Sequence, residues 1–332
     1  MPYKTLSYEE FLDFDQQIRV FKRCGISFER KYTEEMARAY LKNNNSFYRL
    51  SSYCDSFERR RPDGGDGAAE YEGLDFQHLV DLSIIDFRLR EVLLHLIIHI
   101  EHHLKIKLSR FLRLYAIDPC AIVKEFAGSQ YLPQDLYRTM QRASSSDYSR
   151  DIYLECEPDV PVWVMLELLQ LGELKAFISF LRYQDIFSEE DSCTLADLDY
   201  ELGSVRTLRN AAAHNSGILN GLLQCDNRKL SDRIYNELLD AKDQAGNYIF
   251  TEEELEDSNL SRALKDITTA VFLHHDLVTS PGVKRSMAER LHELKLRFNK
   301  RISYDPDKAA GFSLAFLARV IDLWHPFTPA DN

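Results

Sequence analysis

The stretch 75-DFQHLVDLSIIDFRLREVLLHLIIHIEHHLKIKLSRFLRLY-115 decides the fold class, because its apolar residues keep a helical period from end to end. The apolar side chains that recur every three or four residues are Leu79, Leu82, Ile85, Leu89, Leu93, Leu96, Ile100, Leu104, Leu108 and Leu112. A helix of about 40 residues would span roughly 60 Å, so we expect a break near Ser83. The stretch predicts an all-α protein organised around one long helical segment.

Helical patterns continue towards the C-terminus. Asp159 and Pro161 provide an acidic cap and a first-turn proline for a helix that we expect to reach about Tyr183, with a kink at Gly172. We expect Ser188–Asp191 to form an acidic loop before the next helix. Further helices are expected at roughly 228–243, 251–256, 259–278, 283–302 and 312–324. The sequence predicts no β-strand.

Shorter helical patterns and one flexible loop precede the long segment. Ser7 and Thr33 are expected to start helices, and the aromatic patch 47–53 is expected to pack into the core. Pro62–Gly67 predicts a loop because proline and glycine interrupt regular structure. We expect an N-terminal helical and aromatic segment, a core and a C-terminal helical extension, at residues 1–72, 73–225 and 226–332.

Composition is that of an ordinary globular chain. Of the 332 residues, 45% are hydrophobic and 28% are charged, which allows a large buried core. The six cysteines form no C-x-x-C pair, which favours reduced thiols and a cytoplasmic location over a disulfide framework or a zinc site. No apolar run reaches about 18 residues, which argues against a transmembrane helix. The net charge of −12 requires that any nucleic-acid site gather its cations locally.

The candidate active centre is the decapeptide 206-RTLRNAAAHN-215. An apolar helical period runs into it from Leu198, and Asn215 begins an Asn-Ser-Gly helix-stop signal. Arg209, Asn210 and His214 can together hold a phosphate and transfer a proton, and Arg206 and Asn215 are adjacent candidates for RNA contact.

The spacing of arginine and histidine carries no information alone. The chain holds a second match, Arg90-Glu-Val-Leu-Leu-His95, in the middle of the long leucine-rich helix. We interpret this second pair as structural. Arg209 differs because a primary amide, Asn210, follows it and because the match reaches the end of a helix, where side chains can face a cleft.

Three histidines and a basic strip offer alternatives. His95, His99 and His103 recur every four residues, as they would on a metal-binding helix face, although no distant cluster supplies further ligands. The favoured interpretation of these histidines is a packing or solvated face. Near the C-terminus the cations that could contact an RNA backbone include Lys284, Arg285, Lys295 and Arg297. Arg88 and Glu101 are expected to be core ion-pair partners or to line the cleft.

The sequence resembles the Abi-like abortive-infection family, in particular its AbiD/AbiF group, over most of residues 1–220. The motifs that carry the resemblance are Tyr3-Lys4-Thr5-Leu6-Ser7-Tyr8, Tyr48-Arg49-Leu50-Ser51-x-Tyr53, Asp86-Phe87-Arg88-Leu89-Arg90, Ile100-Glu101, Pro161-x-Trp163…Glu167…Gly172 and Leu208-Arg209-Asn210-x-x-x-His214-Asn215. Residues 226–332 carry no motif of this family. The resemblance implies a helical bundle of the HEPN superfamily, with residues 73–225 as its catalytic core.

The resemblance also implies a chemistry. Members of the HEPN type are metal-independent RNA endonucleases that need no cofactor. By its motif, His214 would be the general acid or base, Arg209 would hold the scissile phosphate, and Asn210 would position that phosphate or orient the histidine of a second protomer. The implied partners are an RNA substrate and a cognate antitoxin, either RNA or protein.

Helix geometry adds one constraint. Five residues of ideal helix leave Arg209 and His214 about 140° apart around the axis and about 7.5 Å apart along it. One straight helix therefore does not direct both side chains at one phosphate. Two copies across a two-fold axis would form a composite site, and the resemblance implies such a homodimer. Two alternatives stay open, namely a non-catalytic helical module for RNA binding or oligomerisation, and a metal-dependent hydrolase that uses His95, His99 and His103.

Overall fold

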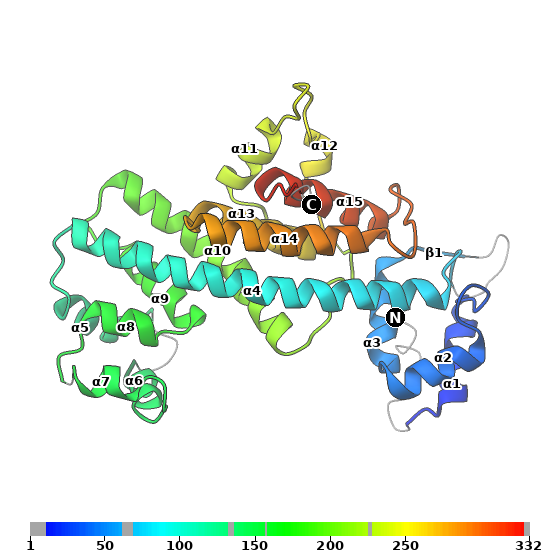
Figure 1. Ribbon diagram of the computed structural model, residues 1–332, viewed down its shortest axis with the longest axis horizontal. Coiled ribbons are helices and arrows are strands. Elements are labelled where there is room, and N and C mark those ends of the chain that lie inside the picture. Colours follow the sequence, from blue (N-terminus) through cyan, green and yellow to red (C-terminus); the bar gives the residue numbers. More distant parts are fainter. Residues whose placement is uncertain (1–10, 62–68, 132–135, 157, 225–227, 329–332) are drawn as a thin grey trace.

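A single helix, α4 (Phe76–Leu114), forms the long axis of the molecule (Figure 1). The computed structural model describes residues 11–61, 69–131, 136–156, 158–224 and 228–328. All ten apolar residues of the predicted period are buried, which confirms the helix and its inward face. The break expected near Ser83 is wrong. The Ser83 hydroxyl donates to the carbonyl of Val80, so it is satisfied without opening the helix.

The N-terminal elements lie at the end of α4 where that helix begins (Figure 1). They are α1 (Phe14–Arg23), α2 (Glu34–Asn43), α3 (Phe47–Tyr53), a 3₁₀ turn (Cys54–Ser56) and the antiparallel strands β1 (Arg59–Arg60) and β2 (Glu70–Tyr71). This strand pair corrects the expectation of no β-strand. Thr33 caps α2 as predicted, and the aromatic patch packs inward through Phe47 and Tyr53. The expected helix start at Ser7 and the loop Pro62–Gly67 lie outside the described residues.

The opposite end of α4 carries a group of short helices (Figure 1). They are α5 (Ala121–Ala127), α6 (Leu136–Ser144), α7 (Arg150–Leu154), α8 (Val162–Leu168) and α9 (Leu171–Leu181). The single helix expected from Pro161 to Tyr183 is therefore wrong. Leu169 and Gln170 are extended, and Gln170 forms a capping box with Glu173 that starts α9. The chain thus breaks before Gly172, where a new helix start satisfies the backbone.

Two local expectations near these helices also change. Asp159 does not cap α8, because its carboxylate pairs with Lys124 at 2.7 Å and Pro161 occupies the cap position. The predicted acidic loop Ser188–Asp191 is the start of α10 (Glu189–Ala213), with Ser188 as its N-cap. Carboxylates in a first helical turn are favourable because they face the positive end of the helix dipole.

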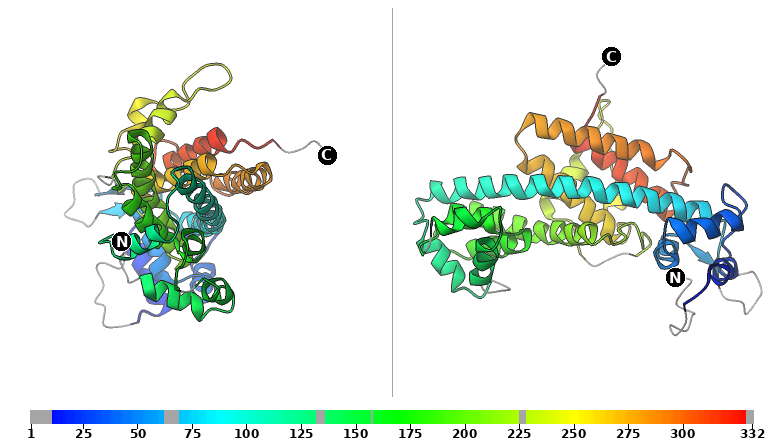
Figure 2. Two further views of the ribbon diagram at one scale, coloured as in Figure 1. Left: turned by 90° about the vertical axis from the view of Figure 1, so that its left-hand side faces the viewer. Right: turned by 60° about the horizontal axis from the view of Figure 1, so that its bottom comes forward.

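The C-terminal helices pack back onto the centre of the molecule (Figure 2). They are α11 (Asp232–Asp240), α12 (Glu252–Leu255), α13 (Arg262–Leu277), α14 (Pro281–Phe298) and α15 (Ala309–Trp324), close to the five predicted ranges. Helix α13 contacts both α4 and α10, while α14 contacts α4. One hydrophobic cluster extends from Ile18 to Trp324, so the N-terminal, central and C-terminal helices share a core. Within the described ranges, no helix has the length and apolar character that crossing a bilayer requires.

Candidate active site at the end of α10

Helix α10 ends at the predicted stop signal in a Schellman motif. His214 is the C-cap residue, and Asn215 adopts a left-handed conformation with φ of 55°. The N–H of Ser216 donates to the carbonyl of Ala211 at 2.7 Å, and the N–H of Asn215 donates to that of Ala212 at 3.1 Å. Asparagine tolerates this conformation better than most residues, which gives Asn215 a backbone role at the helix end.

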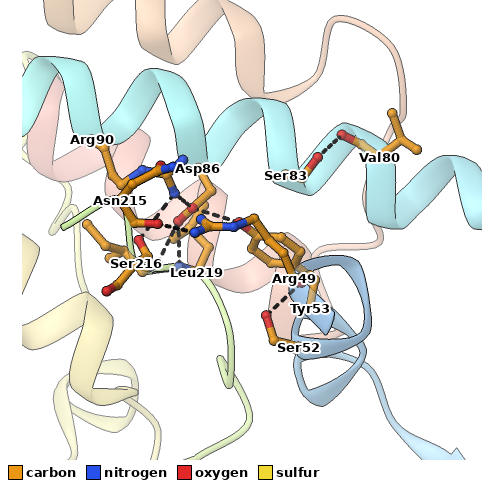
Figure 3. A network of polar contacts seen from close by, with 11 residues as sticks. Arg49, Ser52, Tyr53, Val80, Ser83, Asp86, Arg90, Asn215, Ser216 and Leu219 are labelled. Carbon is orange, nitrogen blue, oxygen red and sulfur yellow. Dashed lines mark hydrogen bonds and ion pairs between the residues drawn. The ribbon is translucent and has the colours of Figure 1, made fainter. Parts of the chain in front are cut away.

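A buried carboxylate, that of Asp86 on α4, holds the segment that follows the turn (Figure 3). Asp86 Oδ1 accepts hydrogen bonds of 2.8 Å from the backbone N–H groups of Ile218 and Leu219. Its Oδ2 accepts a 2.7 Å hydrogen bond from Tyr53 and forms an ion pair with Arg90. Burial, reinforced by the Asp86 charge, raises the pKa of Tyr53, so the phenol remains a proton donor. The network satisfies this buried charge with four donors.

Two arginines bind the carbonyl groups of the turn itself (Figure 3). Arg49 on α3 donates from Nη2 to the carbonyl of Asn215, and Arg90 donates from Nη1 to that of Ser216 at 3.3 Å. Cations are favourable at a helix C-terminus because the carbonyl end of the dipole is negative. The interpretation of Arg90 as structural agrees with its burial in this network. Three sequence motifs that are far apart in the chain therefore meet at the end of α10.

The side of helix α10 that carries Arg206, Arg209 and Asn210 borders a small cavity. Its volume is about 210 Å³, and its described wall consists of Arg142, Gln170, Leu171, Gly172, Glu173, Arg206, Arg209 and Asn210. The structure thus places three predicted residues, Arg206, Arg209 and Asn210, on one surface. The Arg209 guanidinium lies 3.3 Å from the side-chain oxygen of Asn210 and donates to it.

Sequence reasoning missed two members of this wall. Arg142 comes from α6, and nothing in the local pattern distinguishes it from other exposed arginines. Glu173 follows Gln170 by three residues, which is the spacing of a capping box. This spacing is the sequence signal that could have identified the start of α9. Its carboxylate pairs with Arg142 and accepts a 2.5 Å hydrogen bond from Thr139.

His214 lies apart from this cavity within one chain. It is exposed at the C-cap of α10 and does not belong to the cavity wall. The structure therefore agrees with the helix geometry that separates Arg209 from His214. One copy of the described chain brings the arginines and the amide together but not the histidine.

Arg88 lies on a different surface. It lines a separate groove between α4 and α14, and its guanidinium pairs with Glu91 at 3.1 Å. Both side chains are about half-exposed, so the expectation of a core ion pair for Arg88 is wrong. Glu101 is half-buried and pairs with Lys105 at 3.2 Å.

Of the four cations named for the predicted basic strip, three contact groups of the protein itself. Arg297 pairs with the buried carboxylate of Asp81, and Lys295 pairs with that of Asp322. Lys284 donates to a backbone carbonyl on α13 at 2.8 Å, whereas Arg285 is exposed. An RNA contact by this strip stays a prediction. Of the four residues, Arg285 is the most accessible to solvent.

The three histidines of α4 do not converge. His95 contacts the carbonyl of Glu91 at 2.8 Å, and His99 lies 3.2 Å from Nε2 of His274 on α13. His103 instead packs beside the ring of His102. In the part of the chain that the structure describes, no group of three or more histidine, cysteine or acidic side chains is arranged to hold a metal ion.

The comparison with known families agrees with the motifs that lie between residues 39 and 220. The family described as Abi-like protein matches residues 39–220, a range that contains α3, α4 and the end of α10. No significant match was found among curated proteins or among solved structures. The matched range covers more than half of the chain and includes every residue of the network around Asp86. The chain therefore belongs to the Abi-like protein family.

Proposed function

We propose that this protein is a metal-independent endoribonuclease of the HEPN type that acts as an abortive-infection effector or toxin in phage defence. Membership of the Abi-like family supports a role in abortive infection. The observation that carries the enzymatic part is the clustering of Arg206, Arg209 and Asn210 around a cavity on the helix that ends in an exposed His214. In this proposal a cognate antitoxin, RNA or protein, restrains the activity.

The reaction would be an internal transesterification. The 2′-oxygen attacks the adjacent phosphorus and forms a P–O bond while the bond to the 5′-oxygen breaks, so that a 2′,3′-cyclic phosphate and a 5′-hydroxyl result. One proton leaves the 2′-hydroxyl and one is delivered to the leaving 5′-oxygen. The imidazole of His214 can serve in either transfer, because its ring nitrogens can accept or donate a proton. Arg209 would stabilise the negative charge that develops on the phosphoryl oxygens.

The separation of the two groups favours a site shared by two chains. Arg209 lines the cavity and His214 does not, so a second copy would supply the missing histidine across a two-fold axis. Exposed alanine Ala213 and half-buried Ala211 give this end of α10 a small surface that permits close approach.

The test uses the RNA that co-purifies with the protein. RNA bound to the wild type and to His214→Ala is sequenced, and the purified proteins are then assayed on that RNA in EDTA. We expect cleavage with cyclic phosphate ends by the wild type, and none by Arg209→Ala or His214→Ala. Unfolding curves that match the wild type would show that these variants fold. Cleavage retained by His214→Ala would contradict the mechanism, and activity restored only by a divalent ion would select the metal-dependent alternative.

A second candidate is a non-catalytic module for RNA binding or oligomerisation. It is favoured by the position of His214 outside the cavity wall, where the side chain could serve an interface instead of a reaction. RNA that is bound intact by the wild type, together with toxicity that survives His214→Ala, would select this candidate over the nuclease.

A further inference from the structure

We propose that the cavity between α6, α9 and α10 is a phosphate subsite in which Arg142 and Arg206, together with Arg209, bind the backbone of single-stranded RNA. The inference rests on the proposed function, because it assigns the substrate contacts of the same site. It adds Arg142 as a binding residue and Gly172 as the position that leaves room for the ligand.

Charge is the first argument. The described wall contains three guanidinium groups, those of Arg142, Arg206 and Arg209, and one carboxylate, that of Glu173. A net positive cavity in an acidic protein concentrates anions locally, whatever the total charge of the chain. Arg206 and Arg209 are three residues apart on α10 and therefore lie on the same side of that helix.

The carboxylate of Glu173 does not oppose this assignment, because its oxygens are occupied. It accepts hydrogen bonds from Thr139 at 2.5 Å and from the backbone N–H of Gln170 at 2.9 Å, and it pairs with Arg142. Nη2 of Arg142 makes this pair and a 3.0 Å hydrogen bond to Thr139. A guanidinium has five N–H donors, and within the described residues Nε and Nη1 of Arg142 have no acceptor. Glu173 thus orients Arg142 and leaves donors for an anion.

Gly172 shapes the cavity beside Arg206. A Cβ atom at this position would lie 3.4 Å from Nε of Arg206, so the guanidinium packs over the glycine backbone. A side chain larger than that of alanine at position 172 would compete for the space that a bound phosphate needs. The glycine is the second residue of α9 and has no positive φ, so its value here is space and not backbone freedom.

The size and chemistry of the wall select the RNA backbone over a base. About 210 Å³ is less than the roughly 300 Å³ at which pockets for drug-sized ligands begin, so the cavity suits a phosphate group better than a nucleoside. The described wall residues include no aromatic side chain on which a base could stack. Phosphate contacts carry no sequence information, so the subsite would hold RNA of any sequence.

The decisive experiment measures binding without cleavage. A fluorescent, fully 2′-O-methylated single-stranded oligonucleotide cannot undergo transesterification, so its affinity reports the subsite even if the protein has no nuclease activity. Binding is measured between 50 and 200 mM salt for the wild type, Arg206→Ala and Arg142→Ala. We expect each substitution to weaken binding of oligo-U and oligo-A alike, and to reduce the slope of log K against log salt by about 0.7. Arg142→Gln removes the charge but keeps an amide donor for Glu173, so it gives the same test if Arg142→Ala, by leaving Glu173 without its partner, fails to fold.

Matched controls separate the subsite from general charge. Arg110→Ala removes an exposed arginine of α4 that lies outside the cavity wall and should leave the slope unchanged. Gly172→Val removes no charge but should weaken binding about tenfold. Gly282→Val, at the same second position of α14 with open space around its Cβ, should not change binding.

Three outcomes decide the inference. Weakened binding by the cavity variants alone supports it, even where cleavage is absent and the proposed function fails. Cleavage by the wild type with unchanged oligonucleotide affinity in all cavity variants would overturn it while leaving the nuclease intact. In the third outcome, inorganic phosphate binds the wild type but not Arg206→Ala, while both proteins bind the oligonucleotide with the same affinity. The cavity then holds a free anion, and the RNA-backbone assignment is wrong.

Discussion

The carboxylate of Asp86, on α4, accepts a 2.8 Å hydrogen bond from the backbone N–H of Ile218, just beyond His214. This bond connects the central helix of the fold to the end of the helix that carries the candidate active residues. Because Tyr53 and Arg90 bind the same carboxylate, the position of the turn depends on α3, α4 and α10 together.

Replacing Asp86 should destabilise the whole fold. Asp86→Asn removes the charge that compensates buried Arg90, and breaking a buried pair costs about 3 kcal/mol or more. Urea denaturation should show this loss in the free energy of unfolding. Glu91→Gln, which breaks the half-exposed pair with Arg88 on the same helix, is the matched control and should cost less than about 1 kcal/mol. Equal effects of the two substitutions would contradict the role assigned to Asp86.

Arg49 should control the order of the α10 terminus. Arg49→Met keeps much of the side-chain volume but removes the hydrogen bond to the carbonyl of Asn215. Hydrogen bonds to charged groups contribute about 1.5–3 kcal/mol, so the amide of Ser216 should exchange about tenfold faster or more. Arg38→Met, which removes an exposed ion pair between α2 and α1, should leave this exchange rate unchanged. Unchanged protection in Arg49→Met would show that Asp86 and Arg90 hold the turn without Arg49.

A shared site predicts complementation between two inactive proteins. If each proposed site takes Arg209 from one chain and His214 from the other, mixed dimers of Arg209→Ala and His214→Ala contain one intact site. After denaturation and refolding of an equal mixture, about one quarter of wild-type RNA cleavage should return. Each variant refolded alone should stay inactive, and a mixture without activity would place both groups in the same protomer.

Buried histidines predict a loss of stability in acid. Burial, reinforced by neighbouring cations, lowers the pKa of His274 to about 2 and that of His325 to about 4. In the unfolded chain both titrate near 6.5, so below that pH the unfolded state binds protons that the folded state does not. Stability should therefore fall as pH decreases from about 6.5, by about 1.4 kcal/mol per pH unit for each histidine, down to its folded pKa.

The contribution of a histidine to the pH dependence of stability is measured as the difference between a variant and the wild type. The contributions of the carboxylates, which both proteins share, then cancel. The free energy of unfolding is measured as a function of pH between 6.5 and 5. His274→Gln should reduce its slope against pH by the amount that one buried histidine contributes. An unchanged slope in His274→Gln would mean that His274 takes up a proton in the folded state.

Local rules predicted much of the helical architecture. The apolar period from Leu79 to Leu112 predicted α4 and its buried face, because a helix places every third or fourth residue on one side. The Asn215 stop was also readable, since asparagine accepts the left-handed conformation that ends a helix. Length alone was a poor guide at Ser83, which is buried and whose hydroxyl is satisfied within the helix.

The sequence by itself determined the mainly helical class, the long axis, and the placement of Arg209, Asn210 and His214 at one helix end. Only the tertiary structure decided that Arg142 and Gly172 share a cavity with Arg206, and that Asp86 holds the chain beyond His214. Helical periods follow from neighbours within one turn, so a single sequence reveals them. Contacts between α4, α6, α9 and α10 join residues far apart in the chain, and packing of the common core alone brings those residues together.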